Sequence, residues 1–161
     1  MPTRITLSQY QALAELRYQI RQFLSAADAA AHNAGLEPQQ YQLLLAIKGL
    51  PDCMSATIGI LAERLALKHN SAVELINRLE ARGLVRRDRT GEDRRCVLIR
   101  LQPAGAKLVA QVALQRITEL QGEGAALVSA LHALFKPGTP QPKSKAGRKP
   151  VDKSERKNRE R

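Results

Sequence analysis

The sequence predicts a mainly α-helical fold with a small β-hairpin wing, that is, a winged helix-turn-helix. Aromatic residues make up only 3% of the chain and tryptophan is absent, so its core has to be built from leucine, isoleucine, valine and alanine. Apolar residues recur at helical spacing in several segments, and they alternate in one short stretch before residue 102. With 161 residues, the chain is long enough to bury such a core within one domain.

Two helices are expected before residue 50. Apolar residues at helical spacing over "TLSQYQALAELRYQIRQFLSAADAAAHNAG" predict a long first helix, with Ser8 capping its start and Gly35 marking its end. Its apolar stripe is broad and therefore needs a partner helix to cover it. A second helix is predicted by "PQQYQLLLAIKGL", which has Pro38 in its first turn and Gly49 after its end.

A helix-turn-helix and a hairpin are expected next. Two short helices about a tight turn near residues 65–68 are predicted by "SATIGILAERLALKHNSAVELINRLEARGLV", and Gly83 ends the second. Strands "LVRRDR" and "RCVLIRL" follow, joined by a loop that contains Gly91. Alternate residues of the second strand are expected to face the core, namely Val97, Ile99 and Leu101.

The C-terminal third is expected to be helical and then disordered. Pro103 opens a helix over "PAGAKLVAQVALQRITELQ", and Gly122 and Gly124 are expected to interrupt it before a final helix, "AALVSALHALF". From residue 136 the chain is rich in proline, lysine, arginine and serine. Such a segment cannot bury enough apolar surface to offset the entropy lost on ordering, so disorder is predicted.

Charge indicates a polyanionic partner. The chain carries a net charge of +11 and has a pI near 10.3, with +7 contributed by residues 136–161 alone. Eight arginines lie between Arg78 and Arg100, against four carboxylates in the same stretch. Nucleic acid is the commonest partner of a strongly basic protein. Solubility alone is the weaker alternative, because the charge is clustered rather than dispersed.

Several other classes of protein are disfavoured. No apolar run reaches the roughly 18–20 residues that cross a bilayer, and the N-terminus lacks the apolar centre of a signal peptide. Two cysteines, Cys53 and Cys96, are too few for a disulfide framework or a zinc site. We therefore expect a cytoplasmic, nucleoid-associated protein without a membrane partner. Cys53 is expected to be an inert thiol, with a redox role as the alternative.

An enzyme is not expected. The sequence has no glycine-rich phosphate loop, no histidine and cysteine set at metal-binding spacing, and no nucleophile paired with a base. Its three histidines are scattered along the chain. We therefore predict no catalytic residue, no metal site and no cofactor.

The second helix of the helix-turn-helix is expected to enter the major groove of DNA. One face packs on the core, so the opposite face and the N-terminal end are free for base edges and phosphates. Simple exposure to solvent is the alternative for each of these residues: Lys68, His69, Asn70, Ser71 and Arg78. Glu74 would be repelled by phosphate and is instead expected to pair with Arg78 four residues later.

The hairpin tip is expected to enter a minor groove. Arg89, Arg94 and Arg95 surround its turn, and a narrow minor groove attracts inserted arginines through its negative potential. Asp93 is close enough in sequence to brace the guanidinium of Arg95. Packing one strand face on the core would make this wing rigid. A merely solvated basic face is the alternative.

The helix-turn-helix and the wing together resemble a known protein family. The segments "LAERL" and "NRLEARGLV", the wing "DRR", Leu101 at the strand end and then Gly105 together resemble the MarR family of bacterial transcriptional regulators. The resemblance covers about residues 5–135, and the wing joined to "RLEARGLV" is its more specific part. Two positions depart from the family pattern. Lys68 stands where a small capping residue is usual, so Asn70 is expected to cap the helix, and Gln102 replaces a threonine.

The resemblance implies an obligate homodimer that binds a palindromic operator in double-stranded DNA, most simply as a repressor. Asn70, Ser71 and Arg78 would face the major groove, Arg95 would contact the minor groove, and Asp93 would brace it. The implied regions are an N-terminal dimerisation helix (5–35), the winged helix-turn-helix (36–102), C-terminal dimerisation helices (103–135) and a disordered basic tail (136–161).

The resemblance also implies a small aromatic or phenolic effector. Family members commonly bind such compounds between the dimerisation and DNA-binding regions, in a cleft lined from the first, second and fifth helices. Candidate liners are Tyr10, Arg17, His32 and Tyr41. Packed structure is the alternative for each of them, so no pocket residue is assigned.

A second function from another class stays open. A flexible polycation raises nonspecific affinity for nucleic acid through counterion release. The alternative is therefore a nonspecific nucleoid-associated protein whose binding is driven by its basic tail.

Overall fold

The computed structural model describes residues 4–89 and 97–135, which form five helices and a two-stranded antiparallel sheet. The elements are, in chain order, α1 (Leu7–Asn33), α2 (Pro38–Lys48), α3 (Ile58–Arg64), α4 (His69–Ala81), β1 (Val85–Asp88), β2 (Leu98–Leu101) and α5 (Pro103–Phe135). The mainly helical fold with a hairpin wing is confirmed. The predicted tail from residue 136 lies outside the described residues.

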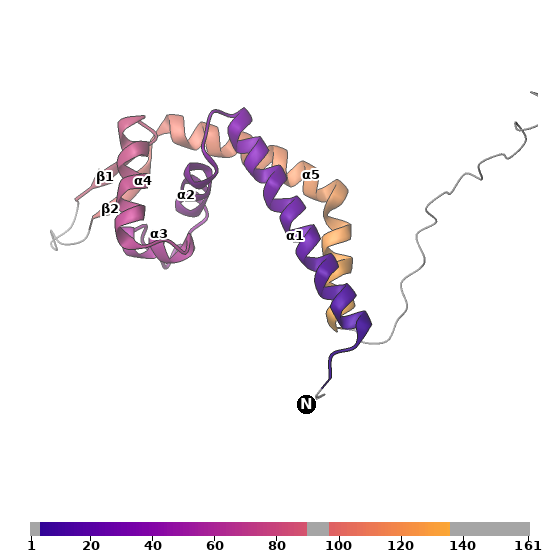
Figure 1. The fold of residues 1–161 in the computed structure, drawn as a ribbon. Coiled ribbons are helices and arrows are strands. Elements are labelled where there is room, and N and C mark those ends of the chain that lie inside the picture. Colours follow the sequence, from indigo (N-terminus) through magenta and orange to yellow (C-terminus); the bar gives the residue numbers. More distant parts are fainter. Residues whose placement is uncertain (1–3, 90–96, 136–161) are drawn as a thin grey trace, which may run out of the picture.

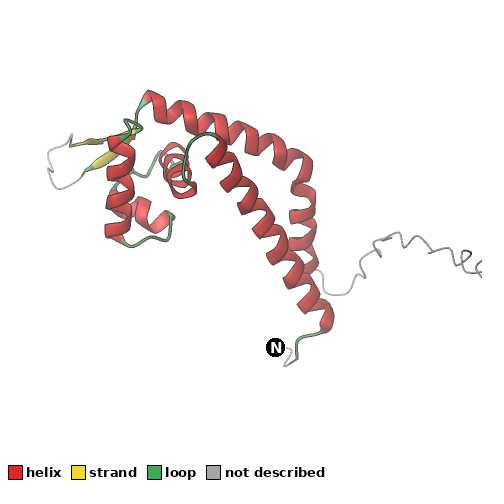
Figure 2. Ribbon diagram, turned by 45° about the horizontal axis from the view of Figure 1, so that its top comes forward, coloured by secondary structure: helices red, strands yellow, loops and turns green. Residues whose placement is uncertain are grey.

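The molecule has two parts, which Figures 1 and 2 show from different directions. We call α2, α3, α4 and the hairpin the lobe, and α1 with α5 the arm. In the arm the two long helices run side by side and lead away from the lobe (Figure 2). The hairpin lies at the far side of the lobe from the arm (Figure 1). The wing and the arm are therefore separate surfaces.

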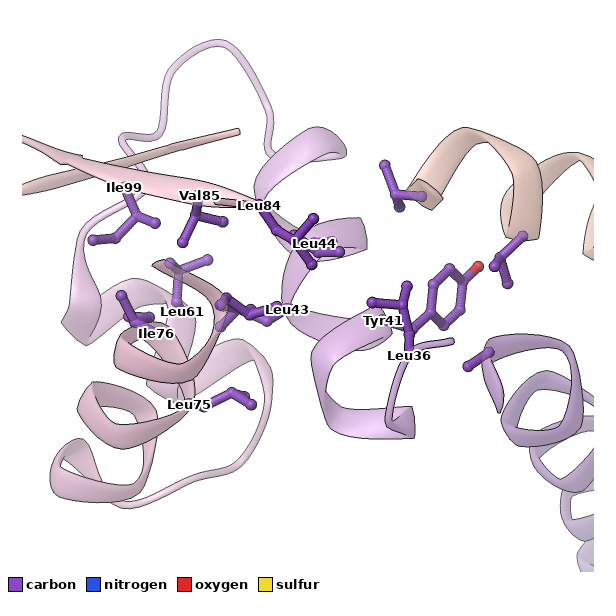
Figure 3. Packing of buried hydrophobic residues seen from close by; sticks show 14 of the residues in the cluster. Leu36, Tyr41, Leu43, Leu44, Leu61, Leu75, Ile76, Leu84, Val85 and Ile99 are labelled. Carbon is purple, nitrogen blue, oxygen red and sulfur yellow. The ribbon is translucent and has the colours of Figure 1, made fainter. Parts of the chain in front are cut away.

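The core of the lobe forms where the hairpin lies on the helix pair α3–α4. Val85 of β1 and Ile99 of β2 are almost fully buried and point toward Leu61 and Ile76 of the two helices (Figure 3). Ile99 also donates its backbone N–H to the carbonyl of Ala56 at 2.8 Å, which ties β2 to the segment before α3. Burying these side chains anchors the wing, as the alternation along β2 predicts.

The first helix begins at a different cap from the one predicted. Thr6 is the N-cap of α1: its hydroxyl accepts from the N–H of Gln9 at 3.3 Å, and the Gln9 side chain accepts from the N–H of Thr6 at 2.8 Å. Ser8 was the wrong choice, because it already lies inside the first turn. The correct signal in the sequence is a threonine followed three residues later by glutamine, which forms a reciprocal capping box.

The C-terminal helix is continuous, so the predicted break at Gly122 and Gly124 is wrong. A glycine ends a helix when it adopts a positive φ, and in the described residues only Gly35 and Gly83 do so among the glycines. Inside a helix each glycine costs about 1 kcal/mol relative to alanine. Packing along α1 compensates for that cost, and the helix bends partway along its length without ending (Figure 1).

The start of α5 is docked tightly on Leu84, the residue before β1. Gln102 donates its backbone N–H to the carbonyl of Leu84 at 2.9 Å, and Gly105 is buried directly above it. A Cβ atom on Gly105 would lie 2.1 Å from the Leu84 oxygen, closer than atoms can approach. The glycine therefore permits the close contact between the lobe and the arm.

We expect Gly105→Ala to destabilise the protein by about 1–3 kcal/mol, because the backbone must shift to admit a methyl group. Gly122→Ala is the matched control, since a Cβ there meets nothing within 4 Å. In the control, alanine should stabilise the helix by about 0.5–1 kcal/mol. Thermal or urea unfolding of the two variants measures both effects, and equal stability of the two would contradict the close packing at Gly105.

Candidate nucleic-acid interface

Helices α3 and α4 form a helix-turn-helix whose turn lies where the sequence predicts it. Ala66 adopts a positive φ of 51° in this turn, and the N–H of Leu67 donates to the Ala62 carbonyl at 2.9 Å. At the other end of α4, Gly83 has a φ of 68° and reverses the chain into β1. The buried face of α4 carries Ala72, Leu75, Ile76 and Leu79.

The opposite face of α4 is exposed and polar. The predicted contact residues all lie there, from the N-cap to the last turn: Lys68, His69, Asn70, Ser71 and Arg78. Within the described part of the chain, none of their side chains makes a hydrogen bond or an ion pair with the protein. The predicted pair of Glu74 with Arg78 is absent there too, because an exposed ion pair gains little over hydration.

The N-terminus of α4 lies two residues earlier than a cap at Asn70 would put it. Lys68 is the N-cap and makes no capping hydrogen bond through its side chain, and the helix begins at His69. The expected cap at Asn70 is therefore wrong. Because no side chain satisfies the first N–H groups of α4, this helix end is free to interact with an anion such as phosphate.

The strand register divides the wing into two faces. Arg87 pairs with Ile99 and Val85 with Leu101, so Arg87 shares the inward face with the core residues. Arg86 pairs with Arg100 on the outward face. An arginine at an inward position is not expected from charge alone, but the two-residue period of the strand does place it there.

Several arginines of the basic stretch bind partners within the protein. Arg87 pairs with Glu80 and donates to the Asn77 side chain at 2.6 Å. Arg100 donates its Nε to Asp88 at 2.7 Å, and Arg86 lies 3.7 Å from the same carboxylate. The pairs of Arg87 with Glu80 and of Arg100 with Asp88 join residues of different elements, so local sequence patterns do not predict them.

Arg82 has partners at the corner between α1 and α2. Its guanidinium donates to the Gln40 side chain at 2.6 Å and to the carbonyl of Gly35 at 2.8 Å. Gln40 is one of the few buried polar residues of the chain. The end of α4 is therefore tied directly to the junction between the lobe and the arm.

Two arginines of the described stretch stay free for an external partner. Arg78 on α4 and Arg89 at the end of β1 are exposed, and no hydrogen bond or ion pair occupies either guanidinium within the described residues. Three predicted wing residues, Asp93, Arg94 and Arg95, lie outside the described residues, as does Cys96. Cys53 is an exposed free thiol.

A small cavity lies in the arm, between α1 and α5. It has a volume of about 130 Å³ and is lined by Gln19, Gln22, Phe23, Ala26, Arg116, Glu119, Leu120, Gly124 and Leu127. Arg116 is more than nine-tenths buried, pairs with Glu119 and lies over the Phe23 ring, 5.3 Å from its centre. Its Nε is buried and has no hydrogen-bond partner among the described residues. The cavity thus combines apolar side chains with two glutamines and the Arg116–Glu119 ion pair.

The four candidate liners named from the sequence are not part of this cavity. Tyr10 and Arg17 are exposed, and His32 lies 3.5 Å from Glu37 on the surface. Tyr41 is buried at the junction of the lobe and the arm (Figure 3). Burial raises the pKa of Tyr41 above its ordinary value, and the nearby Arg116 guanidinium opposes this with a smaller effect. Sequence reasoning did not single out Arg116.

The sequence matches the model of one known protein family. The model of the MarR family matches residues 34–95, which contain α2, the helix-turn-helix and β1. This region, which is less than half of the chain, is similar to the MarR family. No curated protein matches the chain in sequence.

Solved structures of MarR proteins share the fold. A MarR family protein from Bacillus stearothermophilus is 22% identical, with a TM-score of 0.66 over 82% of this chain and 96% of the other. The regulator MOSR of M. tuberculosis, solved in complex with DNA, is 27% identical, with a TM-score of 0.50 over 67% and 77%. CouR from Rhodococcus jostii, bound to p-coumaroyl-CoA, is 21% identical, with a TM-score of 0.59 over 78% and 92%.

Two further findings concern metal sites and membrane spans. In residues 4–89 and 97–135, no group of three or more histidine, cysteine or acidic side chains could hold a metal ion. No helix in that part of the chain has the length and apolar character of a membrane span.

Proposed function

We propose that this protein is a transcriptional regulator of the MarR family that binds double-stranded DNA as a homodimer, most simply as a repressor at a palindromic operator. The observation that carries the proposal is the exposed polar face of α4, whose five predicted contact residues have no partner in the described part of the chain, next to an arginine-bearing wing on the same lobe. A helix of this kind fits the major groove, and a wing beside it reaches the neighbouring backbone or minor groove.

The homodimer is supported by the apolar surface of the arm. Helices α1 and α5 expose large apolar side chains along most of their length. These are Leu7, Tyr10, Leu13, Tyr18, Ile20 and Leu24 on α1, and Leu114, Ile117, Val128, Leu131 and Phe135 on α5. Soluble monomers rarely expose contiguous apolar surface of this extent, so a partner is expected to cover it. A second copy of the chain offers the same surface, as symmetric dimers do.

A nonspecific nucleoid-associated protein is the second candidate function. It is supported by the +7 charge of residues 136–161, whose binding would not depend on DNA sequence. Deleting residues 137–161 separates the two candidates. The regulator keeps its preference for an operator over a scrambled duplex, whereas the nonspecific protein loses its binding and never shows a preference.

An effector is proposed to bind in the arm. The cavity between α1 and α5 is lined by Phe23 and by the positively charged Arg116. A small aromatic compound with a phenolate or carboxylate would pack against Phe23 and pair with the Arg116 guanidinium. Binding there would regulate DNA affinity by changing the arrangement of the two arms.

We expect DNA selected from a random pool to contain a near-palindrome with half-sites about one helical turn apart. Arg78→Ala and Arg95→Ala should each weaken operator binding by about 1–3 kcal/mol, while an exposed arginine of the arm, replaced in Arg21→Ala, should have little effect. Gel shifts at several salt concentrations measure these effects. Unchanged affinity in both lobe variants would contradict the proposed interface.

We expect Ile117→Glu to prevent dimer formation, because a charge would have to be buried between the arms. Ile117 is 54% exposed in the single chain, so the monomer should keep its fold. Gln111→Glu, on an exposed position of the same helix, is the control that places a charge on α5 without removing an apolar side chain. Light scattering after size exclusion gives the mass, and a monomeric wild-type protein would refute the dimer.

We expect some small aromatic acids or phenols to raise the melting temperature and, by linkage, to lower operator affinity. Arg116→Lys keeps the charge but loses the planar guanidinium, so both effects should be strongly reduced while the dimer and basal DNA binding persist. Thermal shift and gel-shift titrations check this. Effectors acting equally on Arg116→Lys and on the wild type would place their site elsewhere.

A further inference from the structure

Arg87 is an unusual member of the basic stretch, because it belongs to the inward face of the wing. It pairs with the buried Ile99 across the sheet, and its side chain is only 23% exposed. The neighbouring Arg86 lies on the outward face, and its side chain is 57% exposed. Charge alone would assign both to DNA, but the strand period directs them to opposite sides.

Three hydrogen bonds join Arg87 to the last turns of α4. Its backbone N–H donates to Oε1 of Glu80 at 2.9 Å, and its Nη1 donates to the other oxygen of the same carboxylate. Its Nη2 donates to the Asn77 side chain at 2.6 Å. Glu80 thereby holds both the main chain and the side chain of one strand residue.

These hydrogen bonds restrict the angle between the wing and α4 more than they add to the free energy of unfolding. Both members of the ion pair are partly exposed, and such pairs contribute little to the free energy of unfolding. A guanidinium that donates from two nitrogens nevertheless has a fixed orientation relative to its acceptors, whereas an ammonium group with a single contact can rotate. The described part of the hairpin also packs on α4 through apolar side chains, and the hydrophobic effect has no direction of its own.

We propose that Arg87, Glu80 and Asn77 form a positioning group that sets the angle between the wing and α4, and that Arg87 does not contact DNA. The inference rests on the proposed function. A duplex binds both surfaces at once only if their separation and angle match its grooves. Glu80 therefore increases operator affinity although its charge opposes that of phosphate.

The sign of the Glu80 effect provides the test. Glu80→Met removes the acceptor at nearly constant size and also removes a negative charge from the lobe. Simple electrostatics predicts tighter DNA binding, whereas loss of positioning predicts operator binding weakened roughly tenfold, a loss of about 1.4 kcal/mol. Glu63→Met is the matched control, because Glu63 is an exposed carboxylate on α3 without a partner in the described residues. It should bind DNA slightly more tightly than the wild type.

Arg87→Lys gives an independent measurement. Lysine keeps the positive charge but cannot reproduce the two-nitrogen contact, so operator affinity should fall about as much as in Glu80→Met. The dependence of binding on salt should not change, because no phosphate contact is lost. Arg86→Lys is the control and should bind normally. Combining Arg87→Lys with Glu80→Met should weaken binding little further, since both break one unit.

Amide hydrogen exchange of the free protein separates this inference from the proposed function. The N–H of Arg87 should exchange faster in Glu80→Met than in Glu63→Met, with or without any DNA binding. Equal exchange in the two variants, or operator binding as tight as wild type in Glu80→Met, overturns the positioning group. Failure of the wild-type protein to prefer any duplex overturns the proposed function instead. Circular dichroism and thermal unfolding confirm that each variant is folded.

Discussion

The packing of the hairpin on the helix pair is the contact on which the rest of the lobe depends. Val85 and Ile99 lie against Leu61 and Ile76, so one cluster holds both strands and both helices of the unit (Figure 3). If the hairpin moved away from the helix pair, apolar side chains of both would be exposed to water. Because the same cluster extends to Val109 and Val112 of α5, the wing, α4 and the arm share one core.

Much of this fold could be predicted from the sequence, because its strongest patterns are local. The turn between α3 and α4, the end of α4 at Gly83 and the buried face of β2 follow from short-range spacing. The errors came where local signals compete. Ser8 and Thr6 can both cap a helix, and only the partner Gln9 decides between them. Gly122 weakens a helix locally, but α1 packs along it.

The sequence predicted which residues of α4 are exposed, but not which arginines have partners within the protein. Residues on the free face of α4 follow from helical period once the buried face is known. The pairs of Arg82 and Arg87 could not be predicted in this way, since each joins residues brought together only by the fold. Buried Arg116 was missed for the same reason, because an arginine among apolar residues of a helix has no local signature. The sequence alone does not distinguish arginines that pair within the protein from arginines that are available for an external partner.

The contact of Arg82 with the corner between α1 and α2 has a mechanical consequence. Its guanidinium joins the end of α4 to a main-chain oxygen at Gly35 and to the buried Gln40, while Gly105 closes the opposite side against Leu84. The lobe is therefore joined to the arm at two points, at Gly35 after α1 and at Gly105 near the start of α5. A change in the tilt of the arm would therefore move α4 with it, and in the proposed homodimer the separation of the two lobes would follow from the angle at which their arms cross.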